Sequence, residues 1–316
     1  MAKRGSSVTL RIGLIGCGRW GRLILRDLTS AGAQVHVAAP TDATLAQALA
    51  LGARTAERDI LALGPMDGYV VATPTATHAA VLEQLLPTGR PIFVEKPMTA
   101  DLASARRLAA AAGDRLFVMD KWRYHPGIEA MRAEISAGAI GEVLAIRTQR
   151  WGWGNPHDDV SALWILAPHD LSITQHLIGE IPPLRSTTVM HPAEPDLGFT
   201  VQLAGDRGPS VSMDIGIASP GHQRRCLVVG RNGAIELRDG YDDKVFARIG
   251  PPGRTGAAER VIEVGRKMPL QAEIETFLSF VAGGPPPMST ACEGLRVVER
   301  ITEIEATLAI DARRAP

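Results

Sequence analysis

The stretch TLRIGLIGCGRWG at residues 9–21 joins an apolar run to a glycine-rich turn, and a helical pattern follows it. This order of buried strand, turn and helix is the dinucleotide-binding fingerprint. Its glycines allow a tight turn, a close approach of backbone amides to a pyrophosphate, and packing of the helix on the strand. The phosphates then lie at the positive N-terminus of that helix. We expect cofactor contacts from Gly16, Cys17, Gly18, Arg19, Trp20 and Gly21.

Strand-like and helix-like segments alternate from this turn to residue 119. The strand-like segments are continuously apolar, which indicates a parallel sheet covered on both faces. We therefore predict an α/β fold whose first domain, residues 1–121, is a doubly wound Rossmann domain. The expected strands are 34–39, 68–72, 91–94 and 116–119, and the expected helices are 43–51, 78–86 and 102–112.

The pattern changes beyond residue 121. Residues 143–150 alternate polar and apolar side chains as a half-buried strand does, and similar segments follow between turn signals. We predict a second, α+β domain over residues 122–316, with a large, open, mainly antiparallel sheet. A helix is expected at 127–136, and helices at 161–177, 271–281 and 292–312 would supply some of the cover for one face, the C-terminal ones packing back on the first domain. The open face suggests a homodimer or homotetramer.

Composition favours a small-molecule partner. The 34 basic and 34 acidic residues cancel, which argues against a nucleic-acid or membrane surface. The cysteines Cys17, Cys226 and Cys292 show neither a disulfide framework nor zinc spacing, so we expect a cytoplasmic protein without a metal. Residues 1–7 lack the apolar core of a signal peptide, and we expect a frayed tail there.

Two further loops follow predicted parallel strands, where ligands of such sheets bind. They are TPTATH at 73–78 and EKP at 95–97. The alternatives are that Thr77 caps the next helix, which His78 merely starts, and that EKP is a solvated charged pair at a turn. Position at the binding edge favours cofactor contacts. The residues concerned are Thr73, Pro74, His78, Glu95, Lys96 and Pro97.

An ordered set of motifs spans most of the chain from about residue 10 to 180. It comprises GCGRWG, ATPTATH, EKP, RYHP at 123–126, GAIGEV at 138–143 and LWILAPHDLS at 163–172. In this order the motifs resemble the family of glucose-fructose oxidoreductase, inositol dehydrogenase and MocA-type proteins. The resemblance implies a nicotinamide-dependent oxidoreductase acting on a sugar, cyclitol or nucleotide-activated sugar bound on the second domain's sheet. It also implies that Lys96 contacts the nicotinamide region and the reacting substrate oxygen, and that His169 is the acid or base.

Both side chains suit this chemistry. A carbinol loses hydride only as its hydroxyl proton departs, and a cation stabilises the charge left on oxygen, while imidazole carries protons near neutral pH. The alternative for His169 is a capping role, with Pro168 at the first position of a helix and Asp170 near its positive end.

One departure from the resembled family concerns an acid four residues before the histidine. Ile165 stands there, so the usual set of lysine, aspartate and histidine is incomplete. Asp170 would point about 100° away around a helix and is a poor substitute. Asp158 and Asp159, in the loop upstream, are alternatives. Related sugar-active sequences often carry His where Asp120 stands.

Two aromatic-rich stretches, 122–125 and 150–155, can form a sugar platform, although core packing is the commoner fate of tryptophan. Arg123 and Arg150 would suit a phosphate or carboxylate of the substrate. We expect substrate contacts from Lys96, Trp122, Arg123, Tyr124, Arg150, Trp153, His169 and Asp170.

The end of the second strand bears on the choice of cofactor. NAD-binding versions of the fold place a carboxylate there, about 20 residues after the glycine loop. Residues 38–41 have none, and Thr41, Arg19 and Arg22 can receive a 2′-phosphate, so we favour NADP. Asp42 keeps NAD as the alternative.

We therefore predict an NAD(P)-dependent dehydrogenase or reductase for a sugar-like substrate. The missing acid leaves two alternatives open. One is a non-catalytic, cofactor-binding member of the family. The other is an imine reductase, or a lyase or hydrolase that cycles a bound cofactor.

Overall fold

The computed structural model describes residues 9–155, 160–255 and 257–314. The expected tail at 1–7, and Asp158 and Asp159, lie outside the described residues. The chain forms two compact units. The first runs to residue 99 and adds 103–119 and 270–294, and the second comprises 100–102, 120–269 and the chain from 295 onward.

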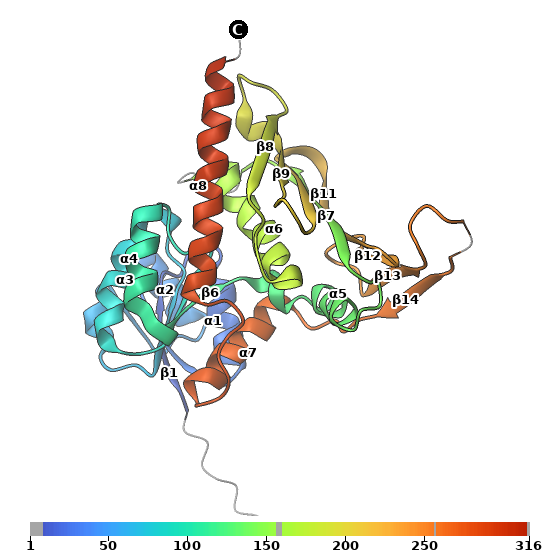
Figure 1. The fold of residues 1–316 in the computed structure, drawn as a ribbon. Coiled ribbons are helices and arrows are strands. Elements are labelled where there is room, and N and C mark those ends of the chain that lie inside the picture. Colours follow the sequence, from blue (N-terminus) through green and yellow to red (C-terminus); the bar gives the residue numbers. More distant parts are fainter. Residues whose placement is uncertain (1–8, 156–159, 256, 315–316) are drawn as a thin grey trace, which may run out of the picture. The chain divides into compact units, whose positions relative to one another are not determined.

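The first unit has the expected Rossmann architecture (Figure 1). Its six strands are parallel in the order β3-β2-β1-β4-β5-β6. The order reverses at β1, and ligands of doubly wound sheets bind at such a switch point. The strands are β1 Arg11–Ile15, β2 Gln34–Ala38, β3 Thr55–Glu57, β4 Gly68–Val71, β5 Ile92–Glu95 and β6 Leu116–Met119. The α-helices are α1 Gly21–Ser30, α2 Asp42–Ala50, α3 His78–Leu85, α4 Leu102–Ala112 and α7 Pro269–Val281.

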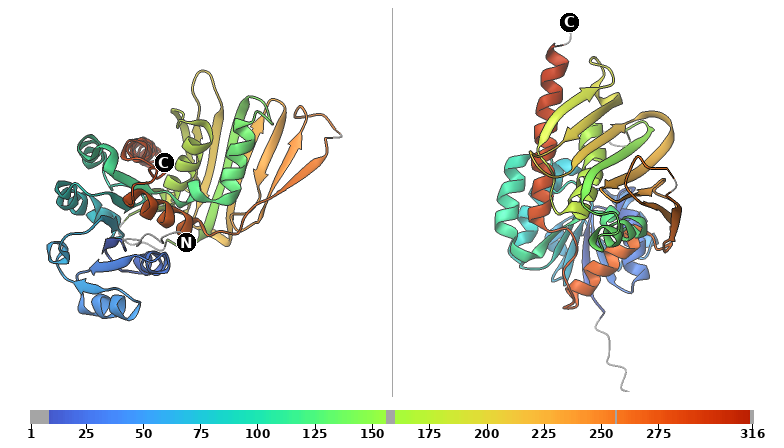
Figure 2. Two further views of the ribbon diagram at one scale, coloured as in Figure 1. Left: turned by 90° about the horizontal axis from the view of Figure 1, so that it is seen from below. Right: turned by 45° about the vertical axis from the view of Figure 1, so that its right-hand side comes forward.

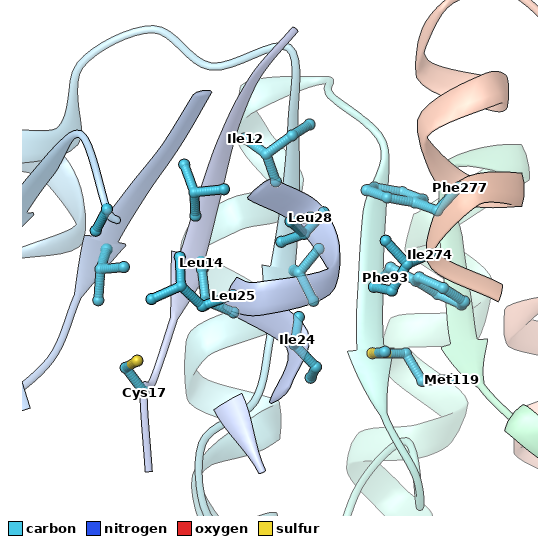
Figure 3. Packing of buried hydrophobic residues seen from close by; sticks show 14 of the residues in the cluster. Ile12, Leu14, Cys17, Ile24, Leu25, Leu28, Phe93, Met119, Ile274 and Phe277 are labelled. Atoms are coloured by element: carbon cyan, nitrogen blue, oxygen red, sulfur yellow. The ribbon is translucent and has the colours of Figure 1, made fainter. Parts of the chain in front are cut away.

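Apolar side chains from distant parts of the sequence build the core of this unit (Figure 3). Ile12 and Leu14 of β1 meet the apolar face of α1. On the same face of the sheet, α7 contributes Phe277, whose ring stacks on Phe93 of β5 with centroids 5.1 Å apart. Burying each such ring stabilises the fold by about 1.5–3 kcal/mol. The core therefore holds the carboxyl ends of β1 and β5, and the loops after them, on a rigid base.

The second unit contains an eight-stranded sheet in the order β14-β13-β12-β11-β7-β10-β9-β8. It is antiparallel except where β10 pairs with β7. The open, mainly antiparallel sheet that we expected is confirmed. The strands are β7 Val143–Trp153, β8 Leu184–Val189, β9 Gly198–Leu203, β10 Ser210–Gly216, β11 Ala218–Gly230, β12 Gly233–Leu237, β13 Lys244–Ile249 and β14 Glu259–Glu263. The helices are α5 Pro126–Ser136, α6 Ala162–Ile178 and α8 Ala291–Arg314.

Helices cover one face of this sheet. α6 packs on β7 and β10, and α5 packs on β12 and β13 (Figure 2). Because side chains alternate along a strand, the buried residues Ile146, Thr148 and Arg150 of β7 point toward the helices. Trp151 and Trp153 lie on the opposite face, and Trp153 is 75% exposed. The alternation thus separates Arg150 from the two tryptophans, so these three side chains do not share one face.

Trp151 lies flat on the backbone of the neighbouring strands. A Cβ atom at Gly198 of β9 would come within 2.5 Å of its ring, and one at Gly216 of β10 would come closer still. Trp151, Gly216 and Gly198 occupy one row across the paired strands. Glycine is therefore required at both positions.

Three local features differ from the expectation. The sequence pattern did not indicate the three-residue strand β3 or the charged strand β14. Pro168 is inside α6, so it does not open a helix, and the capping alternative for His169 is wrong. None of the described helices is long and apolar enough to cross a membrane.

Candidate dinucleotide and substrate sites

Two glycines of the first loop are required by packing within the protein. Gly16 has φ +88°, and a Cβ atom there would lie 2.6 Å from the Ala72 carbonyl oxygen. A Cβ atom on Gly21 would lie 2.5 Å from the Gly16 carbonyl oxygen. A larger residue at either position would push the turn away from β4 or from α1. These are the tight-turn and helix-packing roles of the fingerprint.

Gly18 is different, because a Cβ atom there would meet no heavy atom of the described residues within 4 Å. Packing within the protein therefore does not explain a glycine here. The residue is exposed just before α1, and Trp20, at the N-cap of that helix, makes no side-chain cap hydrogen bond within the described chain. An open glycine before uncapped helix amides fits the pyrophosphate of a dinucleotide.

Glu95 connects this loop to the EKP loop. The Trp20 indole N–H donates to Glu95 Oε1, and the Lys96 backbone N–H donates to Glu95 Oε2 at 3.2 Å. The Glu95 carboxylate thus anchors two loops at the carboxyl ends of β1 and β5. A solvated charged pair, the alternative considered for EKP, does not describe Glu95. Lys96 itself is half-buried, and its peptide bond to Pro97 is cis.

His78 connects the EKP loop to the loop after β4. It is 1% exposed, and its Nδ1 and Nε2 atoms each lie 3.0 Å from a carbonyl oxygen, of Pro97 and Thr73 respectively. The Thr77 hydroxyl donates to Pro74 O at 2.7 Å, and its oxygen lies 2.8 Å from the Thr73 hydroxyl oxygen. It makes no cap hydrogen bond to α3, so the capping alternative for Thr77 is wrong. The three expected cofactor loops are therefore joined by side chains.

An arginine that the sequence pattern did not indicate contacts the loop after β2. Arg58, just after β3, donates to the Pro40 carbonyl at 3.0 Å and pairs with Asp42 at 2.6 Å. Thr41 caps α2, since its hydroxyl accepts the Thr44 N–H at 3.3 Å. The one carboxylate of this loop is thus matched by a guanidinium. Because β3 was not predicted, nothing in the sequence pattern indicated that Arg58 lies here.

Trp122 is the centre of the substrate-side cluster in the second unit. His125 stacks on its ring with centroids 5.1 Å apart and planes at 19°. The Arg150 guanidinium carbon lies 4.7 Å from the ring centroid, and the His169 ring approaches edge-on at 6.5 Å. Trp122 is half-buried, so protein groups cover part of the surface expected to stack on a sugar.

The two arginines expected to bind a substrate anion are engaged within the protein. Arg150 binds Asp170 through Nε at 3.0 Å and Nη2 at 2.8 Å, and both side chains are nearly inaccessible. Arg123 donates to Ser172 at 2.8 Å and to Gln175 at 2.7 Å, also from a buried position. Their charge and donors hold α6 to β7 and to the segment that carries Trp122. The buried Tyr124 lies in that segment.

His125 has a defined tautomer. Its Nδ1 accepts the Gly127 N–H at 3.0 Å, so Nε2 carries the proton and donates to the Gly240 carbonyl at 2.9 Å. Burial lowers the pKa of this imidazole, and the hydrogen bond to Gly240 opposes that effect. The ring stacked on Trp122 is therefore neutral near physiological pH. The RYHP motif contains His125, but the sequence did not indicate its role.

His169 lies inside α6 with Ile165 one helical turn before it. Ile165 is 7% exposed, so a buried apolar side chain, and not an acid, lies one helical turn before His169. Asp170 points to the sheet, and both of its oxygens bind Arg150.

Asp120 is buried just after β6, and its carbonyl accepts the Arg123 N–H at 2.9 Å. Among the described residues, no group of three or more His, Cys, Asp and Glu side chains could hold a metal ion.

Comparison with known proteins assigns the class. Residues 10–118 match a model described as the oxidoreductase family with an NAD-binding Rossmann fold, and residues 128–236 match the GFO/IDH/MocA C-terminal domain. The chain belongs to the GFO/IDH/MocA family of oxidoreductases.

Similar proteins extend over nearly the whole chain. The chain is 30% identical to inositol 2-dehydrogenase of Rhizobium meliloti strain 1021, over 91% of this chain and 93% of that protein. It is 27% identical to the rhizopine catabolism protein MocA of Rhizobium meliloti, over 93% and 94% respectively. The solved structure of UDP-N-acetylglucosamine 3-dehydrogenase GnnA from Acidithiobacillus ferrooxidans shares the fold, with a TM-score of 0.82 and 21% identity over 97% of this chain and 100% of that one.

Proposed function

We propose that the protein is an NAD(P)-dependent dehydrogenase or reductase acting on a CH–OH or carbonyl carbon of a sugar-like substrate. The observation that carries this proposal is the double anchoring of the Lys96 segment. Glu95 connects it to the glycine loop, and His78 connects it to the loop after β4. Residues on either side of Lys96 are thereby held at the sheet edge where a dinucleotide fits.

In this proposal the bound nicotinamide accepts or supplies the hydride. The Lys96 ammonium stabilises negative charge on the reacting oxygen, and His169 Nε2 or Nδ1 takes or returns the hydroxyl proton. Trp122 restricts the His169 ring through its edge contact. Residues 1–121 would bind the dinucleotide, and residues 122–316 would bind the substrate and mediate association.

Names of relatives support a cyclitol, a sugar or a nucleotide-activated sugar as substrate, since they include dehydrogenases of inositol and of UDP-N-acetylglucosamine. The test is a titration of NAD⁺ and NADP⁺ into the full chain, followed by a panel of these compounds with nicotinamide absorbance as readout. Turnover of one of them supports the proposal. Absence of binding for both cofactors overturns it.

Ile165 favours a second candidate function. Without an acid on the helical face of His169, the protein would be a non-catalytic cofactor-binding member, or it would reduce imines or cycle a bound cofactor during elimination or hydrolysis. Net change in nicotinamide absorbance with an alcohol or carbonyl substrate supports the dehydrogenase, and net change with an imine supports imine reduction. Transient change with full recovery and altered substrate supports cofactor cycling, and no change with any compound supports the non-catalytic member.

The loop after β2 supports NADP as the preferred cofactor. Arg58 brings a guanidinium to Pro40 and matches the charge of Asp42, the one carboxylate that would repel a 2′-phosphate. The test compares dissociation constants for NADP⁺ and NAD⁺ in the wild type and in Arg58→Gln. Affinity for NAD⁺ about tenfold tighter in the wild type would overturn this preference.

The open sheet face supports a homodimer or homotetramer in the cytoplasm. Trp151 is spread over glycines on that face, and Trp153 is exposed there. Light scattering on the purified chain gives the oligomeric state. A monomer at micromolar concentration would contradict this part of the proposal.

A further inference from the structure

Arg224 of β11 lies directly opposite Arg150 of β7 in the second sheet. Paired residues of neighbouring strands share a face, so Arg224 points to the helix-covered side on which Arg150, Trp122 and His169 cluster. The Arg224 Cβ would be 2.9 Å from a Cβ atom placed on Gly240, and the Trp122 ring would be closer still. Arg224 and Trp122 therefore flank the same glycine.

The Arg224 guanidinium is held by backbone carbonyl groups. Its Nη1 donates to the Trp151 carbonyl and, at 2.7 Å, to the Gln223 carbonyl. Its Nη2 lies 3.7 Å from the position of a Cβ atom on Gly152, an ordinary van der Waals distance. The side chain is half-buried. Contacts with neutral carbonyls fix the group and leave its charge unmatched.

Arg224 forms no direct ion pair with a carboxylate of the described residues. Asp170 is the nearby buried carboxylate, and both of its oxygens bind Arg150. Among the described residues, no carboxylate lies within ion-pair distance of Arg224. Burial and the charge of Arg150 lower the pKa of this guanidinium, and Asp170 and Asp239 oppose that shift from longer range. The exposed His222 lies over Gly152 beside it, with Nδ1 3.1 Å from the Cβ position.

We propose that Arg224 binds a carboxylate or phosphate group carried by the sugar-like substrate. This inference rests on the proposed function and adds the class of substrate, namely an anionic sugar. Backbone carbonyls already hold the Arg224 side chain in one conformation. Its half-buried guanidinium can therefore form charge-assisted hydrogen bonds to an anion with little further loss of side-chain entropy. Arg150 stays paired with Asp170 beside the site.

The neighbouring residue offers a matched control. Arg225 points to the opposite face of β11 and pairs with Glu236. Arg224→Gln and Arg225→Gln thus remove the same charge one residue apart, from opposite faces of one strand. Arg224→Lys keeps the charge and the aliphatic stem, and provides a second variant if Arg224→Gln does not fold.

The experiment is calorimetric titration of the full chain, saturated with NADP⁺ or NAD⁺, with D-glucuronate, D-glucose 1-phosphate and D-glucose. We expect the wild type to bind one of the anions at least about tenfold more tightly than glucose. Arg224→Gln should lose that advantage, Arg224→Lys should keep part of it, and Arg225→Gln should keep all of it. A preference for glucuronate identifies a carboxylate as the bound group, and a preference for glucose 1-phosphate identifies a phosphate.

Three results would overturn the inference: no preference for either anion in the wild type, unchanged preference in both Arg224 variants, or equal loss in Arg225→Gln. Cofactor affinity, measured first in the same samples, separates this failure from failure of the proposed function. A protein that binds cofactor but not the anions disproves only the anion subsite.

Discussion

The Asp170 carboxylate holds the Arg150 guanidinium through two hydrogen bonds of 3.0 and 2.8 Å, and this buried pair joins α6 to β7. The pair fixes the helix that carries His169. It also keeps the charge of Arg150 matched in a region of low dielectric, where an unmatched charge is unfavourable.

Breaking this pair should destabilise the protein strongly. Asp170→Asn leaves a buried guanidinium uncompensated, so we expect the free energy of unfolding to fall by about 3–5 kcal/mol. Urea denaturation measures the change. Arg231→Gln is the control, because Arg231 pairs with Glu142 at an exposed position where an ion pair contributes about 0–1 kcal/mol. Equal effects of the two variants would contradict the role assigned to Asp170.

Substitution by alanine should lower stability at Gly16 and cofactor affinity at Gly18. Gly16→Ala combines positive φ with a clash at Ala72 and should lower the free energy of unfolding by about 1–3 kcal/mol. Gly18→Ala should leave stability unchanged and weaken cofactor binding about tenfold, since its methyl group enters the space assigned to the pyrophosphate. Gly221→Ala, also in open space, is the control for both measurements. Unchanged cofactor affinity in Gly18→Ala would place the pyrophosphate elsewhere.

Lys96 should be required for turnover but not for folding. Lys96→Ala removes the cation that stabilises the reacting oxygen, and we expect the rate to fall by about 10²–10³-fold or below detection. Steady-state kinetics and cofactor titration on the same sample provide the measurement. Near-normal activity in this variant would remove Lys96 from the mechanism.

His78 should act through the position of the Lys96 segment. In His78→Phe the ring is kept but both carbonyl contacts are lost, so the loops after β4 and β5 can separate. A displacement of about 1 Å reduces a rate by about 10²-fold, so we expect kcat to fall while the unfolding midpoint changes little. Thr77→Val, in the same loop, serves as the control. A variant with wild-type kcat would show that this bridge does not position Lys96.

Acidification should destabilise the second unit through His125. Its folded-state pKa lies below the usual 6.5, so the unfolded chain binds the extra proton first as pH falls. The stability contributed by the neutral ring is fully present above about pH 6.5 and is lost as pH falls through the folded-state pKa. Urea denaturation from pH 8 to pH 5 should show a smaller loss in His125→Gln than in the wild type. Parallel profiles would contradict the burial effect.

The Rossmann sheet was predictable because its strands are continuously apolar and end in recognisable turns, as β1 does at Gly16. β3 and β14 were missed since three residues, or a strand of alternating charges, give no clear apolar period. The separation of Arg150 from Trp151 and Trp153 was detectable, because alternation along a strand follows from the sequence once the strand is assigned.

The candidate site was only partly predictable for a different reason. The local sequence predicted Glu95 and His78 as site residues. It did not predict their contacts, because the partners Trp20 and Pro97 come from other loops. The sequence pattern did not predict that Arg58 and Arg224 lie near the candidate site, because each is brought there only by the pairing of strands. Ile165 was the exception: its departure from the resembled motif was visible in the sequence.

The indole of Trp151, spread over Gly198 and Gly216, has a consequence for how the second sheet assembles. β7 and β10 run parallel, so no hairpin turn sets their alignment. A register shift of one residue would place a side chain under the ring, whereas the native register places Gly198 and Gly216 there. Packing of Trp151 on these two glycines thus favours one register of β7, β10 and β9 over the alternative registers.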